Sequence, residues 1–336
     1  MIYPFAAIVD QEEMKLALIL NVIDPSIGGV LIMGEKGTGK STAVRALAEL
    51  LPEIEVVQGC PFNCDPKGPL CTFCEERKER ESPLPTEKKK MEVVELPLGV
   101  TEDRVLGTLD LEYALVHGKR RFEPGLLARA NRNFLYIDEV NLLEDHIVDL
   151  LLDSAALGTN RVEREGISIT HPCRFILVGS MNPEEGELRP QFLDRFGLCV
   201  EVRAIVDKKL RYEVLRRRIE FDTDREGFLA KWRPEQEKLR EKILKAKEHL
   251  SEVELGEEAY EAVVNLNTQL SLDGHRGDIV LLKAARALSA FKGRDRVTKE
   301  EIKEIAPLAL KHRLKRQPFE DPREELKKLY EVISLI

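Results

Sequence analysis

The pattern of apolar and polar positions along the first part of the chain predicts a parallel sheet covered by helices. Short apolar runs that are nearly continuous are typical of strands buried on both faces, and stretches of helical periodicity separate them. The predicted strands are Gly29–Met33, Ile54–Gln58, Phe134–Asp138, Arg174–Gly179 and Cys199–Val202. The alternation over residues of about 1–203 therefore predicts an α/β fold with a parallel sheet between helices.

The pattern changes after about Ala204, where charged residues and helical periodicity take over. We expect an α/β domain over residues 1–215, a linker over 216–235 and an all-helical domain over 236–336. Within the first domain, residues 59–90 predict an insertion that contains cysteines and ends in a charged loop. That loop, Glu75–Lys90, is dense in charge and holds prolines, so we expect it to be solvated and mobile.

Composition narrows the classes of protein that remain. The chain has 336 residues, of which 43% are hydrophobic, so it can bury a core. Its 60 acidic and 52 basic residues give a net charge of −8, whereas nucleic-acid binders usually carry a basic excess. No apolar run reaches the length of a membrane span. The first residues lack the pattern of a signal peptide, and we expect a cytoplasmic protein.

The stretch GEKGTGKST matches the P-loop pattern in full, and it follows a predicted strand and opens a predicted helix. Backbone amides of such a turn surround phosphates, while its lysine reaches the β- and γ-phosphates and its serine binds Mg²⁺. The alternative is a glycine turn that only starts a helix. The residues expected to contact ATP and its Mg²⁺ are Gly34, Gly37, Thr38, Gly39, Lys40, Ser41 and Thr42.

Two carboxylates follow the apolar strand in NFLYIDEVNLL. Asp138 comes at the carboxyl end of this strand, where doubly wound sheets bind their ligands, so it is a candidate to hold Mg²⁺. Glu139 could polarise a water that attacks the γ-phosphate, a role that a hydrolase needs. The alternative is an acidic strand end that caps the next helix.

Three further residues fit a site that hydrolyses ATP. Asn182 follows another apolar strand and could orient the attacking water, although asparagine before Pro183 is also a common turn residue. Arg195, predicted on a short helix, could stabilise charge on the transferring phosphoryl group of a neighbouring subunit; alternatively it forms an ion pair with Asp194. Arg276 lies in the helical region and could contact the γ-phosphate.

Cysteines cluster in the stretch CPFNCDPKGPLCTFC. Four thiolates at these intervals could surround one tetrahedral Zn²⁺, and a redox or iron–sulfur role and no ligand at all stay open. A cytoplasmic chain argues against structural disulfides. The candidate ligands are Cys60, Cys64, Cys71 and Cys74.

The P-loop together with YIDEVN, GSMNPEEGELRPQFLDRFGL and GHRGDI resembles the AAA+ ATPase subunit of magnesium chelatase. The resemblance covers most of the chain. It implies a P-loop AAA+ core with a five-stranded parallel sheet, followed by an all-α lid domain. It also implies two insertions: a hairpin in helix 2 over residues of about 107–124, and a hairpin before sensor 1 over Asn160–Pro172. The alternation of Val162, Ile167 and Ile169 independently favours the second hairpin, with a turn at Glu165-Gly166.

The resemblance also implies roles and partners. Lys40 and Ser41 would belong to Walker A, Asp138 and Glu139 to Walker B, and Asn182, Arg195 and Arg276 would be sensor 1, the arginine finger and sensor 2. Such a subunit is a Mg²⁺-dependent ATPase that drives Mg²⁺ insertion into protoporphyrin IX. It would form a ring with itself, expected to be a hexamer. Its partners would be an AAA+/integrin-like chelatase subunit and a large porphyrin-binding chelatase subunit.

Three alternatives share the same ATPase residues. A cobaltochelatase uses a similar ATPase subunit, and a MoxR-like AAA+ chaperone remodels a von Willebrand-type partner protein. A nucleic-acid translocase carries similar hairpins, but the acidic balance and the aromatic content of 6% count against it.

Overall fold

The structure is a computed structural model that describes all residues except 111–112, 114, 117–120, 165–166 and 315–321. The chain divides into two compact units. Unit 1 comprises Met1–Ala43 and Met181–Ile336, and unit 2 comprises Val44–Ser180. Buried apolar side chains fill the interior of each unit.

Unit 1 contains two parallel strands that lie side by side. Strand β1 (Val30–Gly34) pairs with β11 (Leu198–Val202), and Gly34 lies opposite Val202. A Cβ atom at Gly34 would lie 2.1 Å from the carbonyl oxygen of Val202. Only glycine permits this close approach of the two backbones, at the point where the P-loop begins.

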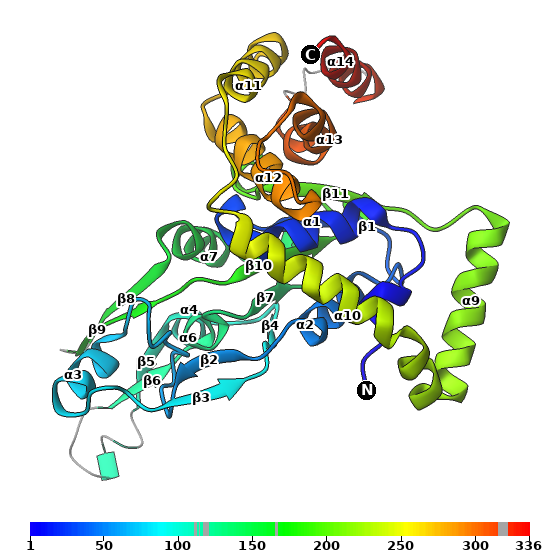
Figure 1. The fold of residues 1–336 in the computed structure, drawn as a ribbon. Coiled ribbons are helices and arrows are strands. Elements are labelled where there is room, and N and C mark those ends of the chain that lie inside the picture. Colours follow the sequence, from blue (N-terminus) through cyan, green and yellow to red (C-terminus); the bar gives the residue numbers. More distant parts are fainter. Residues whose placement is uncertain (111–112, 114, 117–120, 165–166, 315–321) are drawn as a thin grey trace. The chain divides into compact units, whose positions relative to one another are not determined.

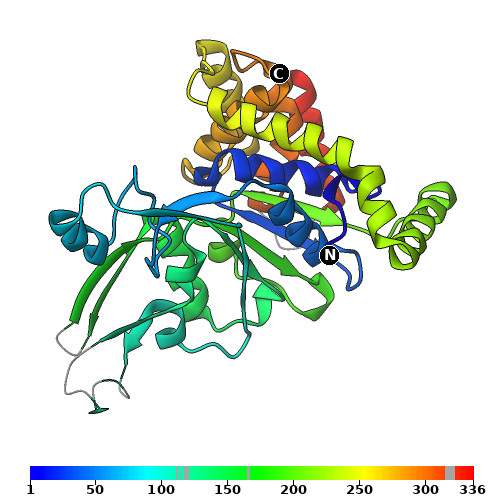
Figure 2. The same ribbon diagram turned by 60° about the horizontal axis from the view of Figure 1, so that its bottom comes forward.

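The rest of unit 1 is mainly helical. Helix α1 precedes β1 and packs against β11, and helices α11 to α14 gather at the C-terminal end of the unit (Figures 1 and 2). The α-helices are α1 (Glu12–Ile23), α8 (Pro190–Leu193), α9 (Lys208–Thr223), α10 (Arg225–His249), α11 (Glu257–Leu270), α12 (Arg276–Lys292), α13 (Lys299–Leu310) and α14 (Pro322–Leu335). Short 3-10 turns are η1 (Phe5–Ala7), η2 (Pro25–Ile27), η4 (Pro183–Glu185) and η5 (Lys311–Arg313).

Local signals in the sequence explain where the C-terminal helices begin and end. Helix α13 begins with a capping box, in which the Thr298 and Glu301 side chains each accept a hydrogen bond from a backbone amide at the helix start. Helix α12 ends at Gly293, which has a φ of 70° and therefore adopts the left-handed conformation that stops a helix.

Unit 2 contributes three parallel strands. Strand β7 (Phe134–Ile137) lies between β4 (Val93–Leu96) and β10 (Ile176–Met181) and pairs in parallel with both. All residues of β7 and β10 are buried, as their continuous apolar sequences predict. Helix α2 (Lys40–Leu50) leads into this unit, and η3 (Val140–Leu142) and α7 (Asp145–Leu157) follow β7.

One predicted strand belongs to a different sheet. Strand β2 (Ile54–Val57) is not parallel to the others but pairs antiparallel with β3 (Thr86–Lys89). The remaining parallel strand is β4, which the sequence analysis missed. Both β2 and β4 are short and include a glutamate, so their apolar patterns alone do not distinguish them.

The expectation of a loop over Glu75–Lys90 is wrong for most of its length. Helix α3 (Thr72–Arg80) covers the first part and β3 covers the last. Charge density does not prevent regular structure here because other contacts hold both elements: Cys74 of α3 is buried, and β3 pairs with β2. Arg77 pairs with Glu81 at 3.0 Å one helical turn away.

Both predicted hairpin insertions are present in unit 2. The first lies between helix α4 (Glu102–Leu106) and α6 (Leu126–Ala130), and its residues 111–112, 114 and 117–120 lie outside the described residues. The second pairs Val162 opposite Ile169, and its predicted turn at Glu165-Gly166 lies outside the described residues. The hairpin strands are β5 (Gly107–Leu109), β6 (Phe122–Pro124), β8 (Thr159–Arg164) and β9 (Ile167–Pro172).

The five parallel strands, the covering helices and the helical C-terminal region confirm the predicted α/β class. The predicted domain boundaries stay a prediction, and helix α10 runs without interruption through the expected boundary between residues 235 and 236. Within the described part of the chain, none of the helices combines the length and apolar character needed to cross a membrane.

Candidate nucleotide site

The P-loop connects β1 to the first turn of α2 and has the backbone conformation that its glycines permit. Gly37 and Gly39 have φ values of 80° and 83°, in the left-handed region where glycine is favoured. The ammonium group of Lys40 donates hydrogen bonds to the backbone carbonyls of Gly34 and of Glu35, the latter at 3.0 Å. Lys40 is therefore held over the loop whose amides would surround a polyphosphate.

A cavity of about 450 Å³ opens beside the P-loop within unit 1. Ile8 and Val9 line it from the N-terminal segment, and Val214 and Leu215 line it from α9. Its volume is typical of small-molecule sites, and its apolar side chains suit a nucleoside. These residues could not be predicted from the sequence, because they belong to two segments far apart in the chain and to no motif.

Basic side chains also line this cavity, which favours an anionic ligand. Lys36 pairs with Glu185 at 2.7 Å, and Arg203 pairs with Glu201 at 2.9 Å. The basic residues of the lining are Lys36, Arg203, Arg211 and Arg218.

The predicted Walker B carboxylate is held by hydrogen bonds within unit 2. Asp138 follows directly after β7 and accepts hydrogen bonds from the Tyr136 hydroxyl at 3.1 Å and from the Ser180 hydroxyl at 2.5 Å. Burial raises the pKa of Tyr136, and the nearby Asp138 carboxylate acts in the same direction. The phenol therefore keeps its proton and acts as a donor, which fixes the orientation of the carboxylate.

Glu139 has an unusual backbone conformation for a residue other than glycine. Its φ is 54°, in the left-handed region, and its amide donates to the Ser180 hydroxyl at 3.4 Å. Such conformations cost free energy and concentrate at functional sites. This observation is independent of the motif that singled out Glu139 in the sequence.

Asn182 follows β10 and caps the short turn η4. Its side-chain oxygen accepts a hydrogen bond from the Glu184 amide at 3.2 Å. This is the turn-forming arrangement that the sequence left open as an alternative. Because the oxygen serves the turn, a role in orienting water would fall to the NH₂ group of the side chain.

Arg195 lies in the turn after α8 and not on the helix itself, because α8 already ends at Leu193. Arg276 begins α12, and its guanidinium group binds the Asp194 carboxylate at 2.7 Å. Arg276 thus lies beside the turn that carries Arg195, since Asp194 is the chain neighbour of Arg195. The Arg276 side chain is 49% exposed, so it keeps access to solvent.

A residue that the sequence did not single out fixes this turn. Arg313 is 4% exposed and binds the Asp194 carboxylate at 3.1 Å. It also donates to the backbone carbonyls of Asp194, Phe196 and Gly197 at 2.8, 2.7 and 3.0 Å. Burial lowers the pKa of Arg313 to about 10, and Asp194 opposes this shift. Arg313 stays charged at neutral pH and holds the backbone on both sides of Arg195.

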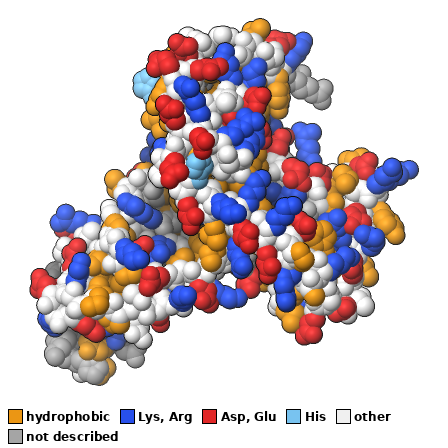
Figure 3. Space-filling model, viewed as in Figure 1, with side chains coloured by type: hydrophobic (Ala, Val, Ile, Leu, Met, Phe, Trp, Pro, Cys, Tyr) orange, Lys and Arg blue, Asp and Glu red, His pale blue; other side chains and the backbone are white. Residues whose placement is uncertain are grey.

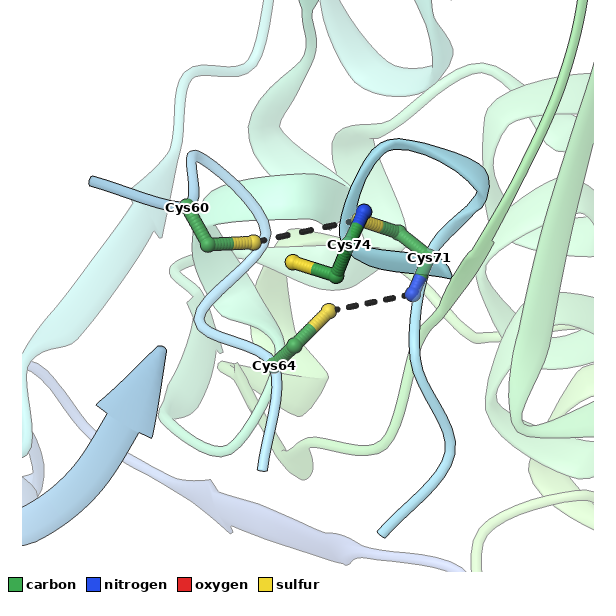
Figure 4. Close-up of side chains that lie close together, drawn as sticks. All are labelled: Cys60, Cys64, Cys71 and Cys74. Atoms are coloured by element: carbon green, nitrogen blue, oxygen red, sulfur yellow. Dashed lines mark hydrogen bonds between the residues drawn. The ribbon is translucent and has the colours of Figure 1, made fainter. Parts of the chain in front are cut away.

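The structure also brings the four predicted cysteine ligands together, with all four sulfur atoms within 4.8 Å of one another. Figure 4 shows the side chains pointing toward a common centre. The candidate site residues are divided between the two units. Unit 1 holds the P-loop, Asn182, Arg195 and Arg276, and unit 2 holds Asp138, Glu139 and the cysteines.

Residues 110–191 match the protein family described as "Magnesium chelatase, subunit ChlI", and residues 260–331 match the family described as "AAA lid domain". The chain is 59% identical over 333 residues to the Magnesium-chelatase subunit ChlI homolog of Methanocaldococcus jannaschii, covering 99% of this chain and 91% of that protein. It is 56% identical over 321 residues to Magnesium-chelatase subunit ChlI of Nostoc sp., covering 95% and 86%.

Two solved structures are also similar to this chain. A structure of the complex between subunits BchI and BchD of magnesium chelatase, based on cryo-EM, contains a chain that is 52% identical. The alignment covers 97% of this chain and 99% of that chain, with a TM-score of 0.54. A putative ATPase from Cytophaga hutchinsonii is 19% identical with a TM-score of 0.66, covering 98% and 90%, and shows the fold alone.

Proposed function

The chain belongs to the magnesium-chelatase subunit ChlI family, and from this we infer that it hydrolyses ATP as the motor subunit of a tetrapyrrole metal chelatase. The observation that carries the proposal is identity of 53–59% to relatives of this name over 95% or more of the chain. Relatives named as magnesium-chelatase subunits favour Mg²⁺ insertion into protoporphyrin IX over cobalt insertion and over MoxR-like remodelling.

The P-loop and the cavity beside it would bind ATP. The backbone amides around Gly37 and Gly39, together with Lys40, would hold the phosphates. The apolar side of the cavity, near Ile8 and Val214, would take the nucleoside. Bound Mg²⁺ neutralises charge on the phosphates, and Ser41 and Asp138 are the residues that would hold it.

Hydrolysis would depend on four further side chains. Glu139 would accept a proton from the attacking water, and Asn182 would orient that water through its amide. Arg195 would reach the ATP of a neighbouring subunit, where an arginine finger accelerates hydrolysis by ~10³–10⁵. Arg276 would contact the γ-phosphate after leaving Asp194.

The assembly we propose follows from the family. The chain would form a ring with itself, a hexamer, and would work with an AAA+/integrin-like chelatase subunit and a large porphyrin-binding chelatase subunit. In support, its relative BchI was reconstructed in a complex with BchD. The nucleotide-binding domain would span residues 1–215, followed by a linker over 216–235 and the lid over 236–336. A cytoplasmic location stays a prediction.

The face shown in Figure 3 gives the nucleic-acid alternative no support. On the face shown in Figure 3, basic and acidic side chains of the described residues are interspersed, rather than gathered by sign. A protein that tracks a nucleic-acid backbone usually presents a continuous basic surface.

The substitution Glu139→Gln tests the proposal. It removes the proton acceptor while keeping the shape of the side chain, so ATP hydrolysis should fall by ~10²–10⁴. Binding of a fluorescent ATP analogue with Mg²⁺ should persist. The matched control is Glu144→Gln, because the Glu144 side chain is 76% exposed and has no proposed role. Turnover that survives Glu139→Gln unchanged would refute the role of Glu139, and a wild-type protein without ATPase activity would refute the function itself.

A further inference from the structure

The four clustered cysteines lie in the interior of unit 2, and none of them belongs to the residues assigned to ATP. Their exposures are 3% for Cys60, 0% for Cys64, 0% for Cys71 and 1% for Cys74. They come from a turn-rich segment before α3 and from the first turn of α3 itself. Nothing in the ATPase chemistry requires thiols, so the cluster needs an explanation of its own.

The spacing of the sulfur atoms fits a single tetrahedral metal. A Zn–S bond of about 2.3 Å places two ligand sulfurs of a tetrahedron about 3.8 Å apart. The sulfurs of Cys60 and Cys71 are 3.8 Å apart, and all four lie within 4.8 Å of one another (Figure 4). A disulfide would require an S–S distance of about 2.0 Å. A cluster of two or more irons would hold some of the thiolates further apart, because they bind different irons.

Backbone amides also point at the sulfurs. The amide of Phe62 donates to Cys60 Sγ at 3.4 Å, and the amide of Cys71 donates to Cys64 Sγ at 3.2 Å. The amide of Cys74 donates to Cys71 Sγ at 3.4 Å, at the beginning of α3. Amide donors and a helix N-terminus stabilise the thiolate form of cysteine, which is the form that binds metals. Neutral buried thiols gain little from such donors. Negatively charged thiolates around a cation gain more from them.

We propose that Cys60, Cys64, Cys71 and Cys74 bind one structural Zn²⁺. The site is closed, with four protein ligands and no position left for a substrate, which is typical of structural rather than catalytic zinc. Tetrahedral coordination by four sulfurs suits Zn²⁺ or a single iron. Zn²⁺ is the simpler occupant because it needs no redox partner. The proposal is independent of the ATPase function.

Contacts around the site indicate what the zinc would stabilise. The ring of Phe62, between two ligands, stacks on His171 of β9 with centroids 4.6 Å apart. The Thr72 hydroxyl donates to the Thr170 carbonyl at 3.2 Å and accepts from the Thr170 amide at 3.3 Å. The metal would thus fix the base of the β8–β9 hairpin to the cysteine segment.

Zinc content of the full-length protein gives the direct test. Protein purified without chelators, after expression in medium supplemented with zinc, should contain one zinc per chain by elemental analysis. The double substitution Cys60→Ser and Cys74→Ser should reduce this to near zero. Cys173→Ala is the matched control, because Cys173 is also buried in unit 2 but lies outside the cluster. It should retain the full zinc content.

Two further measurements keep the test decisive if the serine variant does not fold. Wild-type protein loaded with Co²⁺ in place of zinc should show the thiolate-to-metal absorption bands of tetrahedral sulfur coordination. Removal of zinc by a strong chelator should increase amide hydrogen exchange in β9 and leave exchange in α12 of unit 1 unchanged. Folded wild-type protein that contains no zinc, or that contains iron in its place, would overturn the proposal.

Discussion

At the scale of single residues, Arg313 shows how a buried side chain can support the proposed arginine finger without touching substrate. Its guanidinium group binds one carboxylate and three carbonyls of residues 194–197. A guanidinium with several donors in a fixed plane suits this task better than an ammonium would. Arg313 therefore positions the turn that carries Arg195.

We expect Arg313→Met to destabilise the protein by about 2–4 kcal/mol, because it leaves the Asp194 carboxylate and several carbonyls without their buried donor. Arg276→Met is the matched control for stability, since Arg276 binds the same carboxylate. The Arg276 side chain is 49% exposed, and breaking such an exposed pair costs less than about 1 kcal/mol. Urea unfolding followed by the fluorescence of Trp232, the single tryptophan, measures both. Equal losses in the two variants would contradict the positioning role.

Some residues of the candidate site can be predicted from the sequence and others cannot, for a physical reason. The chemistry of phosphate binding fixes the residue types of the P-loop within one short stretch, so Gly37, Gly39 and Lys40 could be predicted. Arg313 binds backbone carbonyls, which every residue has, so no pattern in the sequence identifies its partners. The same holds for Ile8 and Val9, whose place beside the P-loop depends on the fold of unit 1.

At the scale of elements, the pairing of β1 with β11 leaves no room for a side chain at Gly34. A Cβ there would lie 2.1 Å from the Val202 carbonyl oxygen, and a backbone atom cannot move aside as a flexible side chain can. We expect Gly34→Ala to lower the free energy of unfolding by about 3 kcal/mol, at the upper end of overpacking costs. Strands β1 and β11 must separate to accommodate it.

The P-loop itself offers the control for this substitution. Gly37 has a φ of 80°, but a Cβ there would meet nothing within 4 Å. Gly37→Ala should therefore cost only the strain of a left-handed alanine, about 1–2 kcal/mol. Urea unfolding of both variants measures the difference. If Gly37→Ala proved the more destabilising of the two, the close approach of the strands would not be the cause.

The elements themselves were predictable where their apolar runs were long and continuous. Strands β7 and β10 are fully buried, and the sequence located both within two residues at each end. Strands β2 and β4 each have a glutamate and partial exposure, so the pattern could not say which one joins the parallel strands. Their assignment depends on pairing between distant segments, which periodicity does not report.

At the scale of the whole molecule, the proposed ATPase site is incomplete in one chain. The P-loop, Asp138 and Glu139 would act on the bound ATP of their own subunit, whereas Arg195 would act on the ATP of its neighbour. This division predicts that defects on opposite sides of a shared site complement each other. A ring closed by a repeated head-to-tail interface gives every site the same two-sided composition.

We therefore expect Glu139→Gln and Arg195→Ala to be inactive alone but active when mixed. An intact site needs Glu139 from an Arg195→Ala chain and Arg195 from a neighbouring Glu139→Gln chain, in the correct order around the ring. With equal amounts and random assembly, this occurs at about a quarter of the interfaces, so the mixture should recover about a quarter of the wild-type ATPase rate. The measurement is phosphate release after the subunits are mixed before ATP is added.

A second mixture supplies the control. Lys40→Ala and Glu139→Gln both damage the side of the site that binds ATP, so no arrangement of these two variants restores a complete site. This mixture should stay inactive even though it assembles, which size-exclusion chromatography checks. Recovery in the control mixture would point to general stabilisation by co-assembly. Full activity of Arg195→Ala alone would mean that each chain completes its own site, and a ring would then not be required for hydrolysis.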